Sequence, residues 1–381
     1  MDARARRAVG LIAIAVTVVV ASSTIYLHST SPSKTTTAIV ATPSTIDRSL
    51  VTGDLVEYAF TSASVGWAMD FLQSPPLHFA DQFWLFQTGD GGKHWHQQLT
   101  GKTGFQGPAP YSMQFFDNTH GFVFVRSSPE QLFRTVDGGG HWNALNLPAP
   151  EVTEVAFGGP RFGLLLAGGG QSTLYVTNDG GGTWQRLPDP PADAGSLSVR
   201  NPTEAWMGSA GLTVPHVYSS GVAGESWQRH DLPAPPAKPW TDGGYSANVE
   251  LLPRSGVAVY VPPFNQPQLV FINFALTSFD RGTTWRYVPP PPGVVAHQDA
   301  LHWWAIAGTA LFKSSDAGQS WTVATNTLPM LQFVPHVLDA KHAWAVTIVA
   351  GGYGLSVTSD GGLHWASTMF QNGCIGYRLK R

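Results

Sequence analysis

The sequence predicts an all-β protein built from a repeated unit of four short strands. An eight-residue motif that ends in Trp recurs seven times, and a short apolar segment precedes each copy. The chain also contains 41 Gly, 29 Pro and 14 Trp, whereas only 12% of its residues are charged. This composition suits many strands joined by turns better than it suits a helical protein.

Residues 1–28 differ from the rest of the chain. Three arginines between positions 4 and 7 precede a charge-free apolar run over residues 8–26. As a helix, this run would rise about 28 Å, close to the thickness of the hydrocarbon core of a bilayer. Basic residues before the run place the N-terminus in the cytoplasm and the following chain outside. We therefore expect a membrane anchor, or alternatively a signal peptide cleaved near the small residues at 21–23.

Residues 29–49 are rich in Ser, Thr and Pro and are expected to form a flexible tether. The strand repeats span residues 50–372, and residues 373–381 form a C-terminal tail. When residues 1–30, with three arginines and Asp2, are set aside, the formal net charge changes from −3 to −5. A mildly acidic domain argues against nucleic-acid binding, which needs a basic face. The one cysteine, Cys374, excludes an internal disulfide.

The Trp-ending motif sets the length of the repeat. Its closing Trp residues are separated by 47, 42, 43, 58, 36 and 44 positions, a period that fits four short strands. This period, without helical periodicity, predicts a seven-bladed β-propeller. The seven copies are TGDGGKHW (88–95), TVDGGGHW (135–142), TNDGGGTW (177–184), SGVAGESW (220–227), SFDRGTTW (278–285), SSDAGQSW (314–321) and TSDGGLHW (358–365).

A second element recurs upstream of each copy, an apolar strand. The seven segments are GWAMD (66–70), GFVFV (121–125), FGLLL (162–166), EAWMG (204–208), SGVAV (255–259), HWWAI (302–306) and HAWAV (342–346). In four units an Asp or Asn precedes this strand and predicts a turn in which its side chain binds the local backbone: Asp117, Asn201, Asp299 and Asp339. Each unit is therefore expected to contain a first strand, the turn with the Asp or Asn, the recurring apolar strand, a third strand such as TLYVT (173–177), the Asp-bearing turn and a fourth strand after the Trp.

The residues of the Trp-ending motif have separate structural roles. The Asp is expected to accept backbone N–H groups across a tight turn. The Gly three positions before the Trp would adopt a positive φ, and the Trp would bury its ring between layers. The aspartates and tryptophans in these roles are Asp90, Trp95, Asp137, Trp142, Asp179, Trp184, Asp280, Trp285, Asp316, Trp321, Asp360 and Trp365.

The pattern S/T-x-D-x-G-x-T/S/H-W resembles the Asp-box, or bacterial neuraminidase repeat. The whole unit is similar to repeats of photosystem II assembly factor-like and sortilin-like propellers. Six of the seven copies keep the Asp, whereas Val222 replaces it in the fourth, which predicts a looser turn there. The resemblance implies a propeller fold, but Asp-box proteins include hydrolases, receptors and assembly factors alike.

The motifs do not predict a metal or a cofactor. The Asp-Gly clusters lack the alternating oxygen ligands of a calcium loop, and the histidines recur at fixed repeat positions, which explains them without zinc. A glycosidase of the sialidase type remains an alternative, because Asp70, Asp81, Asp242 and Glu250 could supply carboxyl groups and Arg200 or Arg254 could hold a substrate. These residues do not form a recognisable catalytic signature, and the Phe-Arg-Ile-Pro motif of sialidases is absent.

The sequence therefore favours an exported, membrane-tethered propeller that binds an envelope or extracellular protein without catalysis. A glycan-binding adhesion module is a further alternative. Two insertions depart from the repeat, at 70–82 and within the 58-residue interval at 240–246 and 261–267. Loop residues often carry function, and the expected contacts with a partner are His78, Phe79, Asp81, Trp240, Asp242 and Tyr245.

Overall fold

The computed structural model consists of strands joined by turns, in the part of the chain that it describes. The described residues are 53–74, 79–103, 111–168, 172–211, 214–236, 240, 245–261, 274–329, 331, 334–349 and 352–368. They hold 28 strands, which follow one another as seven consecutive sets of four antiparallel strands. Five sets are separate four-stranded sheets, and the fourth and fifth sets join into one sheet of eight strands. We number the sets 1 to 7 along the chain.

The first three sets cover residues 53–186. Set 1 comprises β1 (Gly53–Phe60), β2 (Gly66–Ser74), β3 (Phe79–Thr88) and β4 (His96–Lys102). Set 2 comprises β5 (Tyr111–Phe115), β6 (Gly121–Val125), β7 (Gln131–Thr135) and β8 (Asn143–Leu145). Set 3 comprises β9 (Val152–Phe157), β10 (Gly163–Ala167), β11 (Thr173–Thr177) and β12 (Gln185–Arg186).

The remaining four sets have the same internal order. Set 4 comprises β13 (Ala194–Asn201), β14 (Glu204–Gly211), β15 (His216–Ser220) and β16 (Gln228–Asp231). Set 5 comprises β17 (Tyr245–Leu251), β18 (Val257–Val261), β19 (Phe274–Ser278) and β20 (Arg286–Val288). Set 6 comprises β21 (Val294–His297), β22 (Trp303–Ala307), β23 (Ala310–Ser314) and β24 (Thr322–Thr325). Set 7 comprises β25 (His336–Val337), β26 (Ala343–Val349), β27 (Gly352–Thr358) and β28 (Ala366–Thr368).

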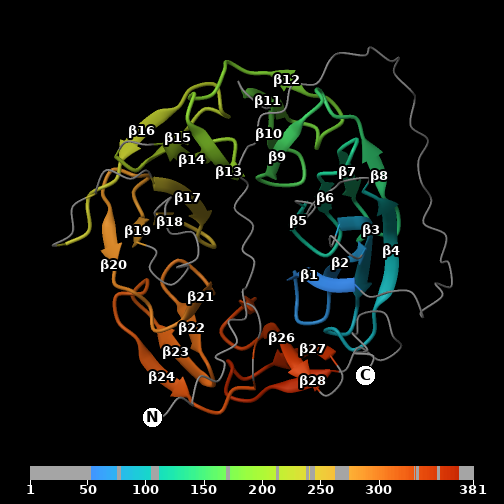
Figure 1. Cartoon of the computed structure of the whole chain (residues 1–381), viewed down its shortest axis with the longest axis vertical. Coiled ribbons are helices and arrows are strands. Elements are labelled where there is room, and N and C mark those ends of the chain that lie inside the picture. The colour runs from blue at the N-terminus through green and yellow to red at the C-terminus, as the bar shows by residue number, and fades with distance from the viewer. Residues whose placement is uncertain are drawn as a thin grey trace, which may run out of the picture.

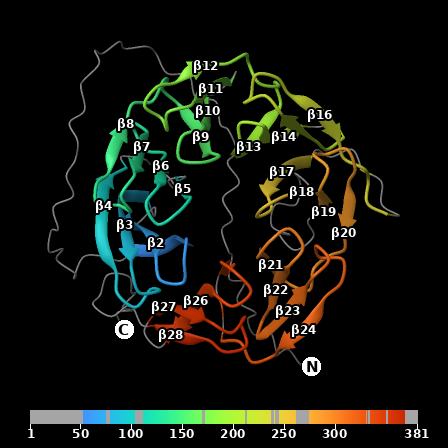
Figure 2. The same cartoon turned by 180° about the vertical axis from the view of Figure 1, so that it is seen from behind.

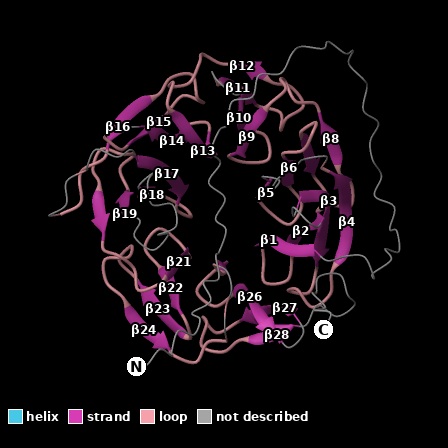
Figure 3. Cartoon of the chain, in the orientation of Figure 1, coloured by secondary structure: helices cyan, strands magenta, loops and turns pink. Residues whose placement is uncertain are grey.

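The sets follow one another around a ring, with the first strand of a set toward the centre and the fourth at the rim (Figure 1). The same order is visible from behind (Figure 2), and the described elements are strands and loops (Figure 3). The predicted apolar strands coincide with the second strands of the sets, and TLYVT coincides with β11, so these predictions are confirmed.

The burial of the strands explains the sequence pattern. Every residue of β6 and of β10 is buried, because a second strand lies inside a sheet that is covered by neighbouring sheets on both faces. The sequence of such a strand is a continuous run of apolar residues instead of an alternation of apolar and polar residues. The fourth strands β12 and β16 are mostly exposed at the rim and carry polar residues.

Aromatic rings join neighbouring sets. The ring of Phe115 at the end of β5 stacks on the indole of Trp67 in set 1, with 3.7 Å between centroids. Phe157 stacks in the same way on Phe122 of set 2, at 3.5 Å. Each stack needs a close approach, since a Cβ on Gly121 would lie 2.2 Å from the Phe115 ring. The core is therefore divided into clusters that each span two adjacent sets.

Sets 4 and 5 are joined by backbone pairing as well as by side chains. Residues 209–211 of β14 pair with residues 245–247 of β17. The pairing depends on Gly208, where a Cβ would lie 2.0 Å from the carbonyl oxygen of Ala247. The sequence did not reveal this junction, because it joins two strands that are separated by β15 and β16.

Candidate functional site

The Asp-bearing turns connect the third and fourth strands, and Asp179 shows their geometry. Its Oδ1 accepts the backbone N–H of Thr183 at 2.9 Å and the Thr177 hydroxyl at 2.9 Å, while its Oδ2 accepts the Thr183 hydroxyl at 2.7 Å. These bonds, led by the Thr183 backbone N–H, lower the pKa of Asp179 to about 2. The carboxylate therefore stabilises the turn, as its sequence position predicts.

Glycine occupies the position three before the Trp because the backbone there has a positive φ. In the turn with Asp179, φ is 86° at Gly181, and the equivalent angle is 79° at Gly318. The preceding position also has a positive φ, which the sequence did not reveal because Arg281 and Ala317 occur there with φ near 59° and 57°. Two successive residues in this left-handed region produce the sharp reversal of the chain.

The Trp that ends each motif packs against its neighbours in the core. Trp142 is 2% exposed, and its ring meets Phe115 edge-on with 6.2 Å between centroids. Trp184 meets Phe157 in the same way, at 6.2 Å. The Trp therefore supports the residue that stacks on the preceding set, which ties the turn to the junction between two sets.

The fourth turn, which lacks the Asp, keeps the fold of the others. The hydroxyl of Ser220 accepts the N–H of Gly224 at 2.9 Å, and φ is positive at Ala223 (55°) and at Gly224 (86°). The hydroxyl and the glycine are sufficient for the reversal, but Val222 cannot accept the bonds that the aspartate accepts in the other turns, so the looser turn stays a prediction. What differs is Val222, which is 48% exposed where the other copies hold a carboxylate.

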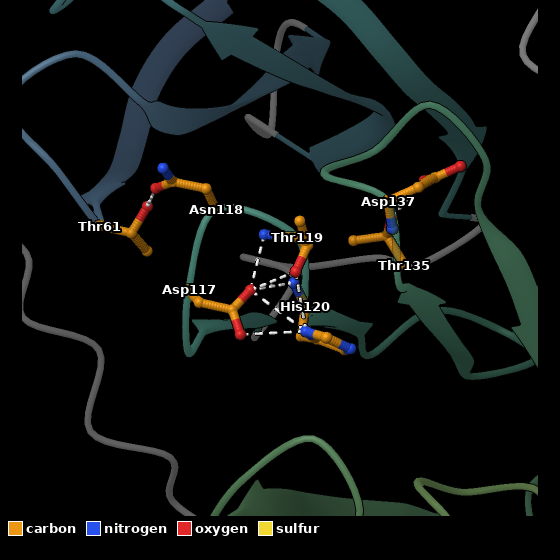
Figure 4. A network of polar contacts seen from close by, with 7 residues as sticks. All are labelled: Thr61, Asp117, Asn118, Thr119, His120, Thr135 and Asp137. Carbon is orange, nitrogen blue, oxygen red and sulfur yellow. Dashed lines mark hydrogen bonds and ion pairs between the residues drawn. The ribbon is translucent and has the colours of Figure 1, made fainter.

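A second family of turns connects the first and second strands. Oδ1 of Asp117 accepts the N–H groups of Thr119 and His120, both at 2.7 Å, and the imidazole of His120 lies 3.0 Å from Oδ2 (Figure 4). The same figure shows Thr61 of set 1 donating to Asn118 at 2.7 Å, which links the turns of adjacent sets. Asp299, Asp339 and Asn201 make comparable backbone bonds, so the predicted turns are confirmed.

The repeated histidines belong to these turns. Six of them place Nδ1 beside the aspartate of their own turn: His94, His120, His141, His302, His342 and His364. Groups of three or more possible metal ligands do not occur among the described residues. Both families of turns lie at the same end of the strands, and we call this side of the ring the turn face.

Four of the six residues expected to contact a partner are described, and these four lie at the other end of the strands. Phe79 begins β3, and Asp81 falls within a register shift between β2 and β3. His78 and Asp242 lie outside the described residues. The two insertions are in sets 1 and 5, which other sets separate on both sides of the ring (Figure 1), so the described structure does not bring them together.

Trp240 and Tyr245 do lie together. Their rings meet edge-on at 5.1 Å, and the indole N–H of Trp240 donates to the carbonyl of Leu232 at 3.0 Å. Tyr245 is only 7% exposed and belongs to a core cluster of sets 4 and 5. The tyrosine is therefore part of the core, whereas Trp240 is the more accessible of the two rings.

Carboxyl groups on the innermost strands are the possible acids of a catalytic site. Burial raises the pKa of Glu57 and of Glu154 to about 7. Glu154 accepts the N–H of Leu197 from the next set at 2.9 Å. Glu250 lies 2.7 Å from Nδ1 of His297, whose Nε2 is 3.1 Å from the hydroxyl of Tyr260.

Of the two arginines that the sequence offers as substrate-binding groups, Arg200 is bonded within the protein and Arg254 is exposed. Arg200 donates to Glu204 at 2.9 Å and to the carbonyls of Leu252 and Gly256 at 3.0 and 2.7 Å. It therefore joins sets 4 and 5. Arg254 is exposed in a turn with φ of 73°. Among the described inner carboxyl groups, Glu154 and Glu250 thus contact groups of the protein itself.

Comparisons with known proteins bear on the fold. Neither a family model nor a curated protein matches the chain. The structure of YCF48 bound to D1 peptide is similar over 81% of this chain and 92% of that one, with 16% identity and a TM-score of 0.51. YCF48 from Cyanidioschyzon merolae gives 15% identity over 81% and 94% of the two chains, with a TM-score of 0.51.

A GH74 xyloglucanase from Xanthomonas campestris is also similar, with 12% identity and a TM-score of 0.50, over 82% of this chain and 60% of the enzyme. Likeness at these identities concerns the fold alone, and it supports a β-propeller. The described residues form no helix that is long and apolar enough to cross a membrane.

Proposed function

We propose that the chain is a seven-bladed β-propeller that acts as a non-catalytic binding or assembly-scaffold protein. Each set of four strands would be one blade, and the motif turns would be Asp-boxes. The seven sets and their likeness to YCF48 structures support this proposal. A rigid ring holds loops in fixed relative positions, which suits a surface that binds a partner.

The proposed location follows from the sequence of residues 1–28. An apolar segment preceded by arginines would tether the ring to the outer side of the cell membrane, or would release it if cleaved. The proposed partner is another envelope or extracellular protein. That a YCF48 structure holds a D1 peptide supports a protein partner for a ring of this kind.

The proposal rests on the contacts that charged side chains of the first strands make with other groups of the protein. Arg200, Glu154 and Glu250 each contact groups of the protein from an adjacent set. A glycosidase instead needs two carboxyl groups that act on one substrate. The described inner strands therefore fit a structural ring more closely than a catalytic one.

The test is recovery of partners from the native envelope with the full tethered chain. One variant carries Trp240→Ala and Asp242→Ala, and it keeps Tyr245 because that ring is buried. The control is Phe279→Ala, which removes an exposed ring on the turn face. A partner that is lost with the first variant and kept with the control supports the proposal. Equal recovery with both variants refutes the 240–246 loop as the binding face.

A glycoside hydrolase is the second candidate. Glu57 and Glu154 favour it, because a carboxyl group with a pKa near 7 can act as a general acid at neutral pH. A panel of glycoside substrates tests this, with Glu57→Gln and Glu154→Gln as variants. Hydrolysis that either variant abolishes would replace the scaffold proposal, whereas glycan binding without turnover would identify an adhesion module.

A further inference from the structure

A polar pocket lies at the junction of sets 4 and 5, on the turn face. Its volume is about 540 Å³, within the range of pockets that hold small ligands. One wall comes from set 4 and includes Glu204, Ser219 and Gln228. The other wall is the Asp-bearing turn of set 5, residues 280–283. It adjoins the fourth copy of the motif, where Val222 replaces the aspartate.

The repeat explains why space remains at this junction. Arg134, on the third strand of set 2, reaches the turn of set 3 and donates to the carbonyl of Asp179 at 2.9 Å. Lys313 occupies the same repeat position in set 6 and lies 4.7 Å from the centroid of the Trp304 ring. The corresponding residue of set 4 is Ser219. Its short side chain leaves open the space that Arg134 fills at the junction after set 2 and Lys313 at the junction after set 6.

The wall from set 4 carries a carboxylate with spare capacity for hydrogen bonds. Oε2 of Glu204 accepts Nε of Arg200 at 2.9 Å, whereas Oε1 has only the indole N–H of Trp206 at 3.4 Å. An ionised carboxylate can accept about four hydrogen bonds. The Glu204 side chain is 15% exposed, so this remaining capacity is directed to the pocket that it lines. Gln228 adds an exposed amide to the same wall.

The opposite wall carries a cation. Arg281 is exposed, and within the described chain its guanidinium makes no hydrogen bond or ion pair. Its φ is 59°, a conformation that L side chains rarely adopt and that four other copies fill with glycine. Asp280 beside it is already bound to Ser278 and Thr284.

We propose that this pocket binds a small zwitterion of amino-acid or dipeptide size. The carboxylate of Glu204 receives the ammonium group, with Gln228 beside it, and the guanidinium of Arg281 holds the carboxylate of the ligand. The nearby charges Glu204, Arg200, Asp280 and Arg281 sum to zero, which favours a ligand that carries both signs over a simple anion or cation. This site is separate from the 240–246 loop and does not depend on the proposed function.

The test measures binding of L-alanyl-L-alanine to the full chain by calorimetry. Two blocked analogues are compared, the N-acetyl dipeptide without the ammonium and the dipeptide amide without the carboxylate. We expect each block to weaken binding about tenfold or more, because each removes one charge-assisted contact. Absence of binding, or equal binding of the blocked analogues, would overturn the proposal.

Two variants locate the contacts. In Glu204→Gln the free and acetylated dipeptides should bind equally, and in Arg281→Gly the acid and the amide should bind equally. Arg254→Gly is the matched control, since Arg254 is also exposed with a positive φ in set 5 but lies outside the pocket lining. The site would be contradicted if Arg254→Gly bound the dipeptide acid and its amide equally. It would also be contradicted if Arg281→Gly still preferred the acid as strongly as the parent chain does.

Arg281→Gly introduces the residue that other copies use there, so this variant should fold and its Tm should match that of the parent chain. If Glu204→Gln lowers the Tm because Arg200 loses its partner, the Arg281 comparison decides the question alone.

Discussion

The ring of Phe60 lies flat on the indole of Trp344, with 3.8 Å between centroids and 3° between planes. These residues belong to the first and the last set, so the stack closes the ring. Tyr58 adds a hydrogen bond to the carbonyl of Trp344 at 3.0 Å, and Nε2 of His336 lies 3.0 Å from the carbonyl of Phe60. Each end set completes its own four strands, and side chains join the two.

Phe60→Ala should lower the free energy of unfolding by about 3–5 kcal/mol, because it removes a buried ring and leaves a cavity. Phe157→Ala is the matched control, since Phe157 forms the same kind of stack within the chain. Both should lower the Tm by similar amounts. Hydrogen exchange should become faster in β1 and β25–β28 for Phe60→Ala alone. If exchange became faster to the same extent in all sets, ring closure at this contact would be contradicted.

Val222→Asp should stabilise the protein. The variant turn would read SGDAGESW, with Ser220 and Ser226 placed as Ser314 and Ser320 are around Asp316. The new carboxylate would accept the N–H of residue 226, a gain of about 0.5–1.5 kcal/mol. The reverse change, Asp316→Val, should cost a similar amount. A decrease in Tm for Val222→Asp would show that this turn is built differently.

Glu154→Gln should change how stability depends on pH. Burial raises the pKa of Glu154 from 4.5 in the unfolded chain to about 7, so between these values the folded state binds more protons. The stability due to the protonated group is full below pH 4.5 and is lost as the pH rises through 7.

The glutamine variant should therefore exceed the parent chain by about 1–3 kcal/mol at pH 8 and match it near pH 4. Urea unfolding at the two pH values measures this difference. Glu225→Gln, at an exposed position, serves as the control and should leave the profile unchanged. A constant difference at all pH values would argue against a raised pKa.

Gly208→Ala should disrupt the junction of sets 4 and 5. The added methyl group would lie 2.0 Å from the carbonyl of Ala247, on rigid backbone that has no room to move. We expect a loss of about 2 kcal/mol or more. Gly195→Ala is the control, because its nearest neighbour would be at 3.5 Å. Equal Tm values for both variants would exclude a tight junction at Gly208.

The sequence predicted the local parts of this structure because they depend on neighbouring residues. The side-chain bonds of Asp179 and Asp117 stay within four positions of the acid, so a motif is enough to define them. The stack of Phe115 on Trp67 joins residues 48 positions apart, and single positions in the repeat do not reveal it.

The pocket was missed for a related reason. Its origin, Ser219 opposite Arg281, becomes visible only when equivalent positions of different sets are compared at a junction in space. The sequence did give one signal, the replacement of Asp by Val222 in the fourth copy, but that residue alone does not predict a cavity. Ring closure was likewise beyond reach, because it depends on contacts between residues 276 to 286 positions apart.

The stack between Phe60 and Trp344 also sets an order of events in synthesis. A chain emerges N-terminus first, and within each set the strands that pair are consecutive in sequence, so sets can form one after another. The ring of Phe60 in set 1 then stays exposed until Trp344 of the last set has been synthesised. A chaperone that covers apolar surface would be needed most by this first set, and truncated chains that lack set 7 would be the species most prone to aggregate.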